Sequence, residues 1–347
     1  MVRFAWASFL LVFPSQILAD DPQLLQALAL QRTIQKVIRN AEASIASIVV
    51  SRSKRYQQWD RATKSKPGEL GIFSLDRINL TGLSETKRKQ IERLDLTNPR
   101  NVPEAYGSGV VIDSSGLILT NAHVVDGATR IYVRLSGRRG SYANIHALDP
   151  RSDLAILKLI NRPLNLPALK LGNADKVKKG EFVVTLSNPY SVGFVDGSPS
   201  ASHGMISNLR RRLPGYTSEV ERNKLSLHHY GTLIQTDARI QAGCSGGALL
   251  NLKGEMIGLI SAQAGISGLD TPGGFALPMT SGLRRIIEVM GKGKEVEYAF
   301  LGVQFSTSNM KGGPPRLAVV IPGSPAERGG LRSRDYIHAV DGTEVRS

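Results

Sequence analysis

The stretch QAGCSGGALLN, residues 241–251, places Ser245 between the chain's one cysteine, Cys244, and two glycines. Glycine adopts backbone conformations that other residues avoid, so such a loop can approach a bound substrate closely. Either the hydroxyl of Ser245 or the thiol of Cys244 could act there as a nucleophile. A serine needs a base to take its proton, and the base needs a carboxylate to orient it. The loop therefore carries chemistry only if both partners exist elsewhere in the chain.

One histidine and one aspartate stand in suitable settings. His123 lies in LTNAHVVDG, where an apolar segment runs into a turn, and Asp153 lies in RSDLAILKL, directly before the most apolar segment of the first half. Each residue alone is typical of a satisfied core or turn position. Together with Ser245, they predict a nucleophile, its general base and the acid that orients the base.

Length and composition indicate the number of domains, the fold class and the surface charge of the protein that carries these residues. The chain has 347 residues, of which 41% are hydrophobic, enough for a large core divided over two or three domains. Its 35 glycines, its short β-branched runs and its 6% aromatic content favour a strand-rich body over a helical bundle. Lys and Arg outnumber Asp and Glu by 44 to 29, so the surface either attracts anions or is simply a well-solvated face.

Residues 1–19 have the pattern of a secretory signal peptide. Arg3 precedes the apolar run Phe4–Phe13, and Ala19 precedes the acidic Asp20 at the expected cleavage point. The run is too short to span a bilayer comfortably, and an uncleaved anchor is the alternative. The signal-peptide pattern therefore predicts an exported protein. A single cysteine cannot form an internal disulfide, so the periplasm or bacterial cell envelope fits the chain better than a disulfide-rich extracellular setting.

The elements that must position the candidate residues follow from periodicity. Residues 20–43 predict a helix, because Asp21-Pro22 is typical of an N-cap followed by proline at the first helical position. Residues 44–50 predict the first strand. Residues 51–103 form a basic, polar insertion with at most one short helix near residues 84–94, and an insertion of this length is either a functional loop or disordered.

Two successive runs of about six short strands follow between Tyr106 and Pro278, which predicts two small antiparallel barrels. The spacing of apolar residues predicts a helix over 281–290. A glycine-lysine linker follows it, and a glycine-rich β segment at 298–347 ends the chain.

The order His123, Asp153, Ser245, with the first two on the first barrel, is that of the chymotrypsin-like fold. From residue 107 to 278, the motifs GSGVVID, TNAHVVDG, SDLAILKL, LGNADKVKKGEF and QAGCSGGALLN occur in the same order as in the HtrA (DegP-like) family of trypsin-like serine proteases, which the chain resembles. The resemblance implies an all-β, chymotrypsin-like double β-barrel over residues 44–282. It also implies an exported protease that cleaves unfolded or damaged proteins through an acyl-enzyme, without a cofactor or metal.

The resemblance assigns roles to the candidate residues. His123 becomes the general base, Asp153 the acid that orients it, and Ser245 the nucleophile. The backbone N–H groups of Gly243 and Ser245 become the oxyanion hole, an element commonly worth ~10²–10³ in rate. Cys244 stands where the family usually has asparagine. It is an inert packing residue, a thiol whose oxidation blocks the site, or itself the nucleophile.

Two further stretches depart from the family pattern. Arg239 lies where related enzymes line the primary specificity pocket. Pointing inward it would favour acidic substrate side chains, and pointing to solvent it would leave the pocket apolar beside Ile240. Residues 210–231 are longer than the family needs and carry an arginine cluster and the pair His228-His229, which is a regulatory or anion-binding candidate but a weak metal site.

The end of the chain resembles another module. Residues 283–297 are expected to be helix and linker, and residues 298–347 resemble the first half of a PDZ domain, which predicts a truncated PDZ-like β domain. The resemblance implies that a substrate's terminal carboxylate binds to backbone amides of Phe300, Leu301, Gly302 and Val303. A partial β unit packed on the protease is the alternative.

Two other functional classes compete with the protease. A catalytically silent chaperone on the same fold would have no need of the complete set His123, Asp153 and Ser245. A polyanion-binding envelope protein rests on charge alone and predicts strongly salt-dependent binding. The expected partners are therefore unfolded polypeptides. Anionic envelope polymers and a homotrimer are further candidates, and no specific nucleic acid is expected.

Overall fold

The computed structural model describes residues 22–56, 81–101, 103–137, 139–189, 196–211, 232–261, 274–306 and 313–345. The predicted signal peptide and the pair His228-His229 lie outside these residues. The chain separates into two compact units, Met1–Glu295 and Val296–Ser347. Within the described ranges, no helix is both long and apolar enough to cross a membrane.

The first unit opens with helix α1 (Pro22–Ala41) and the 3₁₀-helix η1 (Glu42–Ser44). Proline suits the first helical position because its missing N–H would have no intrahelical partner there. Of the side chains on α1, those of Val37 and Ala41 are buried, so only its final turns contribute to the core. Helix α1 lies within residues 20–43, for which the sequence predicts a helix.

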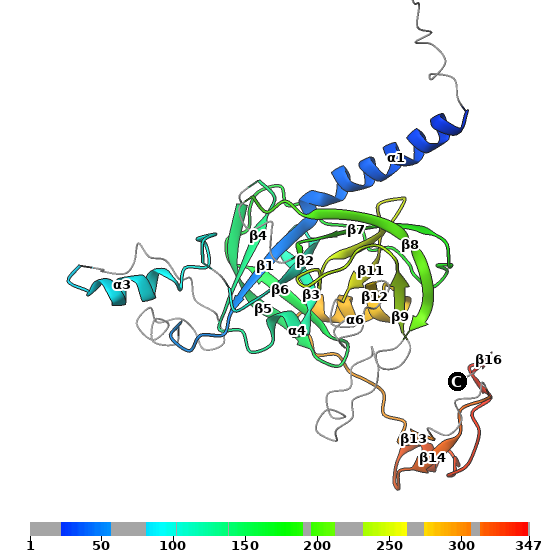
Figure 1. Ribbon diagram of the computed structural model, residues 1–347. Helices are drawn as coiled ribbons and strands as arrows, with labels where there is room; N and C mark the ends of the chain where they lie inside the picture. The colour runs from blue at the N-terminus through cyan, green and yellow to red at the C-terminus, as the bar shows by residue number, and fades with distance from the viewer. Residues whose placement is uncertain are drawn as a thin grey trace, which may run out of the picture. The chain divides into compact units, whose positions relative to one another are not determined.

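Two closed barrels, each of six strands within the described residues, form the body of this unit (Figure 1). In the first, the strands are hydrogen-bonded in the order β1-β2-β3-β6-β5-β4, with every pairing antiparallel. Closure leaves no free sheet edge. The strands are β1 (Ile45–Ser51), β2 (Ala105–Asp113), β3 (Leu117–Asn121), β4 (Arg130–Leu135), β5 (Arg139–Asp149) and β6 (Leu154–Leu159).

The second barrel has the order β10-β11-β12-β9-β8-β7, again antiparallel throughout. Its strands are β7 (Phe182–Ser187), β8 (Ser200–Arg211), β9 (Leu233–Thr236), β10 (Ala248–Asn251), β11 (Met256–Ile260) and β12 (Gly274–Pro278). Helix α6 (Ser281–Gly291) follows, capped by Thr280 and buried along one face at Leu283, Ile287 and Met290. The predicted all-β, chymotrypsin-like double barrel is confirmed.

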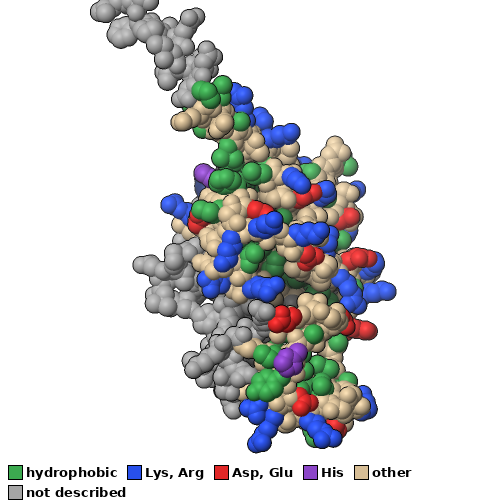
Figure 2. Space-filling view, turned by 90° about the vertical axis from the view of Figure 1, so that its right-hand side faces the viewer, with side chains coloured by type: hydrophobic (Ala, Val, Ile, Leu, Met, Phe, Trp, Pro, Cys, Tyr) green, Lys and Arg blue, Asp and Glu red, His purple; other side chains and the backbone are tan. Residues whose placement is uncertain are grey.

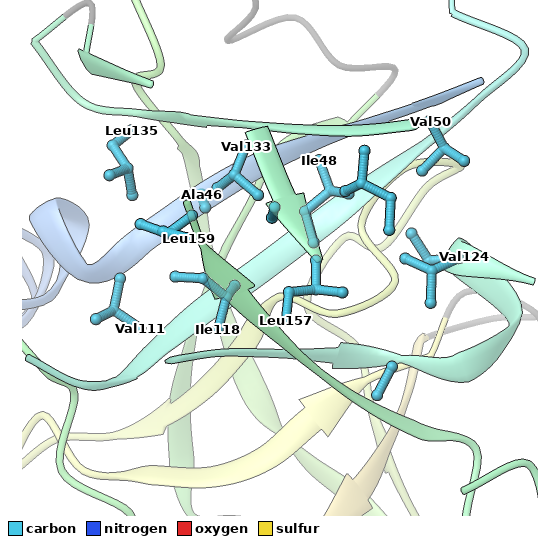
Figure 3. Close-up of a cluster of buried hydrophobic side chains, with 14 of the residues drawn as sticks. Ala46, Ile48, Val50, Val111, Ile118, Val124, Val133, Leu135, Leu157 and Leu159 are labelled. Carbon is cyan, nitrogen blue, oxygen red and sulfur yellow. The ribbon is translucent and has the colours of Figure 1, made fainter. Parts of the chain in front are cut away.

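Aliphatic side chains from successive strands fill the first barrel (Figure 3). On β1, Ala46, Ile48 and Val50 point inward, as the alternation of a half-buried strand requires. Yet all of β1 is buried, because its outer face is covered too. Val49 on that outer face packs in a separate cluster with Leu94 and Leu96 of the insertion.

The described part of the insertion is therefore fastened to the outside of the first barrel. Its helix α3 (Glu85–Glu92) begins at Ser84, whose hydroxyl accepts the N–H of Lys87. Downstream, the Tyr56 hydroxyl donates to the carbonyl of Leu94, and the guanidinium of Arg130 lies 5.0 Å from the centre of the Tyr56 ring. The burial of Tyr56, Leu94 and Leu96 distinguishes these parts of the insertion from a disordered linker.

We expect Tyr56→Phe to lower the free energy of unfolding at neutral pH by about 1–3 kcal/mol, because it leaves the Leu94 carbonyl unsatisfied. Burial also raises the pKa of Tyr56 to about 12 from 10.0. Since the unfolded phenol ionises first, its contribution to stability is present below about pH 10 and is lost as the pH rises toward 12. The substitution should remove this part of the alkaline loss.

Urea unfolding at pH 7 and between about pH 10 and 12 measures both effects. Tyr106→Phe on β2 is the matched control, because Tyr106 is only half-buried. Equal unfolding free energies for Tyr56→Phe and the unaltered protein at neutral pH would show that the insertion is not held in this way.

The second unit has two small hairpins: β13 (Val303–Phe305) with β14 (Leu317–Val320), and β15 (Ala339–Val340) with β16 (Thr343–Glu344). A short helix, α7 (Pro325–Arg328), lies between them in the chain and is capped by Ser324. Gly302 adopts φ 83°, and a side chain there would collide with Ser324. Its carbonyl accepts the N–H of Ile321 at 2.8 Å, which ties residues 300–303 to the end of β14.

Candidate active site

The imidazole of His123 and the carboxylate of Asp153 form a direct pair. His123 lies on the short helix α4 (Ala122–Val125), directly after β3. Its Nδ1 is 2.8 Å from Oδ2 and 3.0 Å from Oδ1 of Asp153, and its backbone N–H donates to Oδ1 at 3.0 Å. The His123 side chain is 25% exposed and that of Asp153 only 8%. The ring thus faces Asp153 on one side and remains partly open to solvent.

Asp153 occupies a strained turn between β5 and β6. Its φ is 54°, a left-handed conformation that non-glycine residues seldom adopt. The residues around His123 hold it there. The carbonyl of Asp153 accepts the N–H of Ala122 at 3.0 Å, and the Asn121 carboxamide donates to both its carbonyl and Oδ2 at 3.2 Å. Asn121 is fully buried, so these bonds are shielded from water.

Ser245 lies in the loop between β9 and β10 of the second barrel, and it is buried. Ser108 of β2 reaches across from the first barrel to this loop. The Ser108 N–H donates to the Ser245 carbonyl at 2.7 Å, and the Ser108 hydroxyl donates to the Gly243 carbonyl at 2.8 Å. The candidate nucleophile loop is therefore hydrogen-bonded to the barrel that carries His123 and Asp153.

Gly107 of β2 lies close to residues of the candidate site from both barrels. A Cβ built on Gly107 would lie 2.7 Å from the side chain of Val124 and 3.2 Å from the carbonyl oxygen of Ser245. Val124 directly follows His123 on α4. Val124 and the carbonyl of Ser245, which come from opposite barrels, thus lie on the same side of Gly107, where its side chain would be. The structure brings His123 and Asp153 into direct contact and places the backbone of Ser245 near Gly107, close to the residue that follows His123.

Comparisons with known proteins show which protein family the chain matches. Residues 107–259 match the trypsin-like peptidase domain, and residues 316–347 match the PDZ domain. The periplasmic serine endoprotease DegP of Salmonella typhimurium is 35% identical over 252 residues, which cover 70% of this chain. A solved structure titled HtrA-type protease AlgW with tripeptide superimposes with a TM-score of 0.60 at 26% identity, covering 90% of this chain and 84% of that one. The chain belongs to the HtrA family of trypsin-like serine proteases.

Other HtrA relatives extend the match. A probable periplasmic serine endoprotease DegP-like of Ectopseudomonas mendocina is 34% identical over 323 residues, 88% of this chain. The chain spans 50% of the length of the Salmonella protein and 61% of the Ectopseudomonas protein. Both relatives are named as periplasmic, in agreement with the exported location predicted from the sequence.

Cys244, which departs from the usual HtrA asparagine, points into the second barrel. It is 2% exposed and packs in the core cluster with Leu249 and Ile260, among others. Its Sγ accepts the N–H of Gln241 at 3.3 Å, and its own N–H donates back to the Gln241 carbonyl at 3.0 Å. This environment favours the packing interpretation of the thiol.

Arg239, the second departure, is exposed, and its backbone N–H donates to the Ser202 hydroxyl at 3.1 Å. Its neighbour Ile240 instead packs against the core of the second barrel. A Cβ on Gly274 would collide with the Ile240 side chain, so the glycine makes room for it. This arrangement favours the alternative in which Arg239 faces solvent.

Two of the predicted peptide-binding residues, Phe300 and Leu301, are exposed in the second unit. The carbonyl of Leu301 accepts the N–H of Ala326, and Phe300 is 63% exposed in the second unit. Among the described residues, no three His, Cys, Asp or Glu side chains are grouped as a metal would require. Figure 2 shows Lys and Arg side chains spread over the visible face among fewer acidic ones.

Sequence reasoning missed Asn121 and Ser108. Both stand within motifs that carry the family resemblance, TNAHVVDG and GSGVVID, but their types alone do not reveal what they contact. A serine inside a strand pattern and an asparagine before a histidine are also typical of edge and cap positions. The contacts of both residues cross between segments that are distant in the chain.

Gly246, next to Ser245, cannot accept a side chain. Its φ is 85°, and a Cβ there would collide with the Ser108 carbonyl and the Thr120 hydroxyl. We expect Gly246→Ala to destabilise the protein by more than about 1 kcal/mol and to abolish reaction of Ser245 with a fluorophosphonate. Gly254→Ala is the control, because Gly254 has φ 78° but nothing within 4 Å. If both variants behave alike in thermal unfolding and labelling, the collision has no role.

Proposed function

We propose that this chain is an exported serine endopeptidase that cleaves unfolded or damaged proteins through an acyl-enzyme intermediate. The observation that carries the proposal is the His123–Asp153 pair, with Nδ1 2.8 Å from Oδ2, held beside the loop of Ser245. An oriented imidazole next to a serine in a glycine-rich loop is the arrangement that activates a hydroxyl.

The reaction follows from these roles. The Ser245 oxygen attacks the carbonyl carbon of a substrate peptide while Nε2 of His123 takes the hydroxyl proton. Asp153, bonded to Nδ1, keeps Nε2 free to accept that proton and stabilises the imidazolium that forms. His123 then donates this proton to the leaving amine. In the second half of the reaction, His123 takes a proton from the water that attacks the acyl-enzyme, and it returns that proton to Ser245. Each step uses the one ring whose orientation Asp153 sets.

The oxyanion of the tetrahedral intermediate needs donors. We assign this role to the backbone N–H groups of Gly243 and Ser245. Gly243 has φ 89°, which allows the chain to turn sharply just before Ser245. Such donors act at the position where charge develops in the transition state, so they lower the barrier without tightening substrate binding.

The substrate is proposed to place a small apolar side chain beside Ile240. Arg239 is exposed, so it adds no cation to the pocket, while Ile240 occupies the space over Gly274.

The backbone amides of Phe300, Leu301, Gly302 and Val303 are proposed to receive a terminal carboxylate in the second unit. From the family resemblance we also propose that the chain assembles as a homotrimer through its N-terminal region. Light scattering would measure the mass of the assembly.

The decisive experiment exposes the full chain to casein and to a fluorophosphonate probe, and it identifies the labelled residue by mass spectrometry. We expect casein fragments and a single adduct on Ser245. Absence of labelling on Ser245 under any activating condition would favour a catalytically silent chaperone. Salt-dependent retention on a polyanion without any cleavage would favour the envelope-binding class, which rests on the net charge of +15.

A further inference from the structure

Ser108 makes more contacts with the nucleophile loop than its place in a barrel strand requires. It is fully buried on β2. Its hydroxyl donates to the Gly243 carbonyl at 2.8 Å and accepts the N–H of Asn188 at 2.8 Å. Its backbone N–H donates to the Ser245 carbonyl at 2.7 Å, and its carbonyl accepts the Thr120 hydroxyl at 2.7 Å. One residue thus joins β2, β3, the end of β7 and the loop before β10.

These bonds fix two peptide groups of the loop. The group between residues 243 and 244 is held at its carbonyl by Ser108 and at its N–H by the Gln241 carbonyl, 3.0 Å away. The group between residues 245 and 246 is held at its carbonyl by Ser108 and at its N–H by the Ile260 carbonyl, 2.9 Å away. The proposed oxyanion donors, the N–H groups of Gly243 and Ser245, belong to the peptide groups that alternate with these two.

We infer that the hydroxyl of Ser108 is a positioning group for the oxyanion hole. A peptide group is planar, so holding the planes on both sides of the 244–245 peptide restricts the direction of the Ser245 N–H. The Gly243 N–H is restricted in the same way from one side. Any residue except proline at position 108 would supply the backbone N–H bond to the Ser245 carbonyl, but only the serine side chain supplies the bond to Gly243. The inference rests on the proposed function, because it needs an oxyanion to stabilise.

The hydroxyl also ties the two barrels together at this point. Asn188, which follows β7, is fully buried, and its carboxamide has no hydrogen-bond partner within the described residues. Loss of the Ser108 hydroxyl would leave the Asn188 N–H and the Gly243 carbonyl unpaired as well. Both groups could then turn toward each other or toward water, which would rotate the 243–244 peptide group.

Steady-state kinetics of Ser108→Ala in the full chain test the inference. We expect kcat to fall about 10-fold or more, because misaligned donors lose part of the ~10²–10³ that one oxyanion donor supplies. KM should change less than about 2-fold, since these donors act in the transition state. The acid limb of the pH profile of kcat/KM should stay in place, because the His123–Asp153 pair is untouched. A loss of folded enzyme alone would lower the active-site titre and leave kcat per labelled site unchanged.

Ser141→Ala is the matched control. Ser141, also buried on a first-barrel strand, has a hydroxyl that donates to the Tyr142 carbonyl at 2.7 Å and accepts the Asn161 N–H at 2.9 Å. It therefore loses the same two kinds of bond away from the site, and its kcat should equal that of the unaltered protein.

Ser108→Cys covers the case in which the alanine variant does not fold, because a thiol keeps the size of the group and donates weakly. We expect its kcat to lie between those of serine and alanine. An unchanged kcat in a folded Ser108→Ala or Ser108→Cys variant would overturn this inference alone. Failure of the unaltered protein to label Ser245 would overturn the proposed function, and this inference with it.

Discussion

Ser245→Ala is expected to abolish peptide cleavage, with kcat falling by about 10⁶ if the residue acts as the nucleophile of a coupled set. The reason is chemical. Without the hydroxyl, no acyl-enzyme forms, and the His123–Asp153 pair has no proton to draw. The fold should tolerate the change, because alanine fits the space that serine leaves. Casein cleavage and fluorophosphonate labelling measure the effect, and both should disappear together.

Cys244→Ser is the companion variant, since it separates the neighbouring thiol from the hydroxyl. The thiol is buried in the core of the second barrel, and we expect the variant to retain labelling on Ser245. Cleavage that survives in Ser245→Ala but is lost in Cys244→Ser would reverse the assignment and make the thiol the nucleophile.

Asp153→Asn is expected to lower kcat by about 10⁴ while leaving KM nearly unchanged. The carboxylate now accepts the ring N–H of His123 through Nδ1 and also the backbone N–H of the same residue. An amide in its place can present its N–H₂ to Nδ1. The ring would then carry its proton on Nε2, where it cannot accept one from Ser245. Kinetics on a peptide substrate over a range of pH measures the loss.

Asp113→Asn makes the same chemical change at the exposed end of β2, so it serves as the control. Thermal unfolding of both variants should show whether the strained turn at Asp153 still forms. A folded Asp153→Asn variant with full activity would mean that His123 is oriented by some other group, and the proposed mechanism would need a different acid.

Many of the strands and helices could be predicted from local patterns in the sequence. Alternating apolar residues in short runs predicted the strands of both barrels, and proline after an acidic residue predicted the start of α1, which begins at Pro22. These features depend on neighbours within a few residues, which a linear sequence displays directly. Full burial of β1 was not evident from its pattern, because part of the cover over its outer face, at Val49, comes from Leu94 and Leu96, far along the chain.

The sequence by itself determined the residues of the candidate site and their order, because a nucleophile, a base and an orienting acid are recognisable by type and motif. Only the tertiary structure decided how they are held. The Ser108 hydroxyl meets a carbonyl 135 residues away at Gly243, and Asn121 meets Asp153 across 32 residues. The burial of Cys244 and the exposure of Arg239 were settled in the same way. Such contacts depend on how two closed sheets dock against each other, and hydrogen bonding between distant segments leaves no period in the chain that could reveal it.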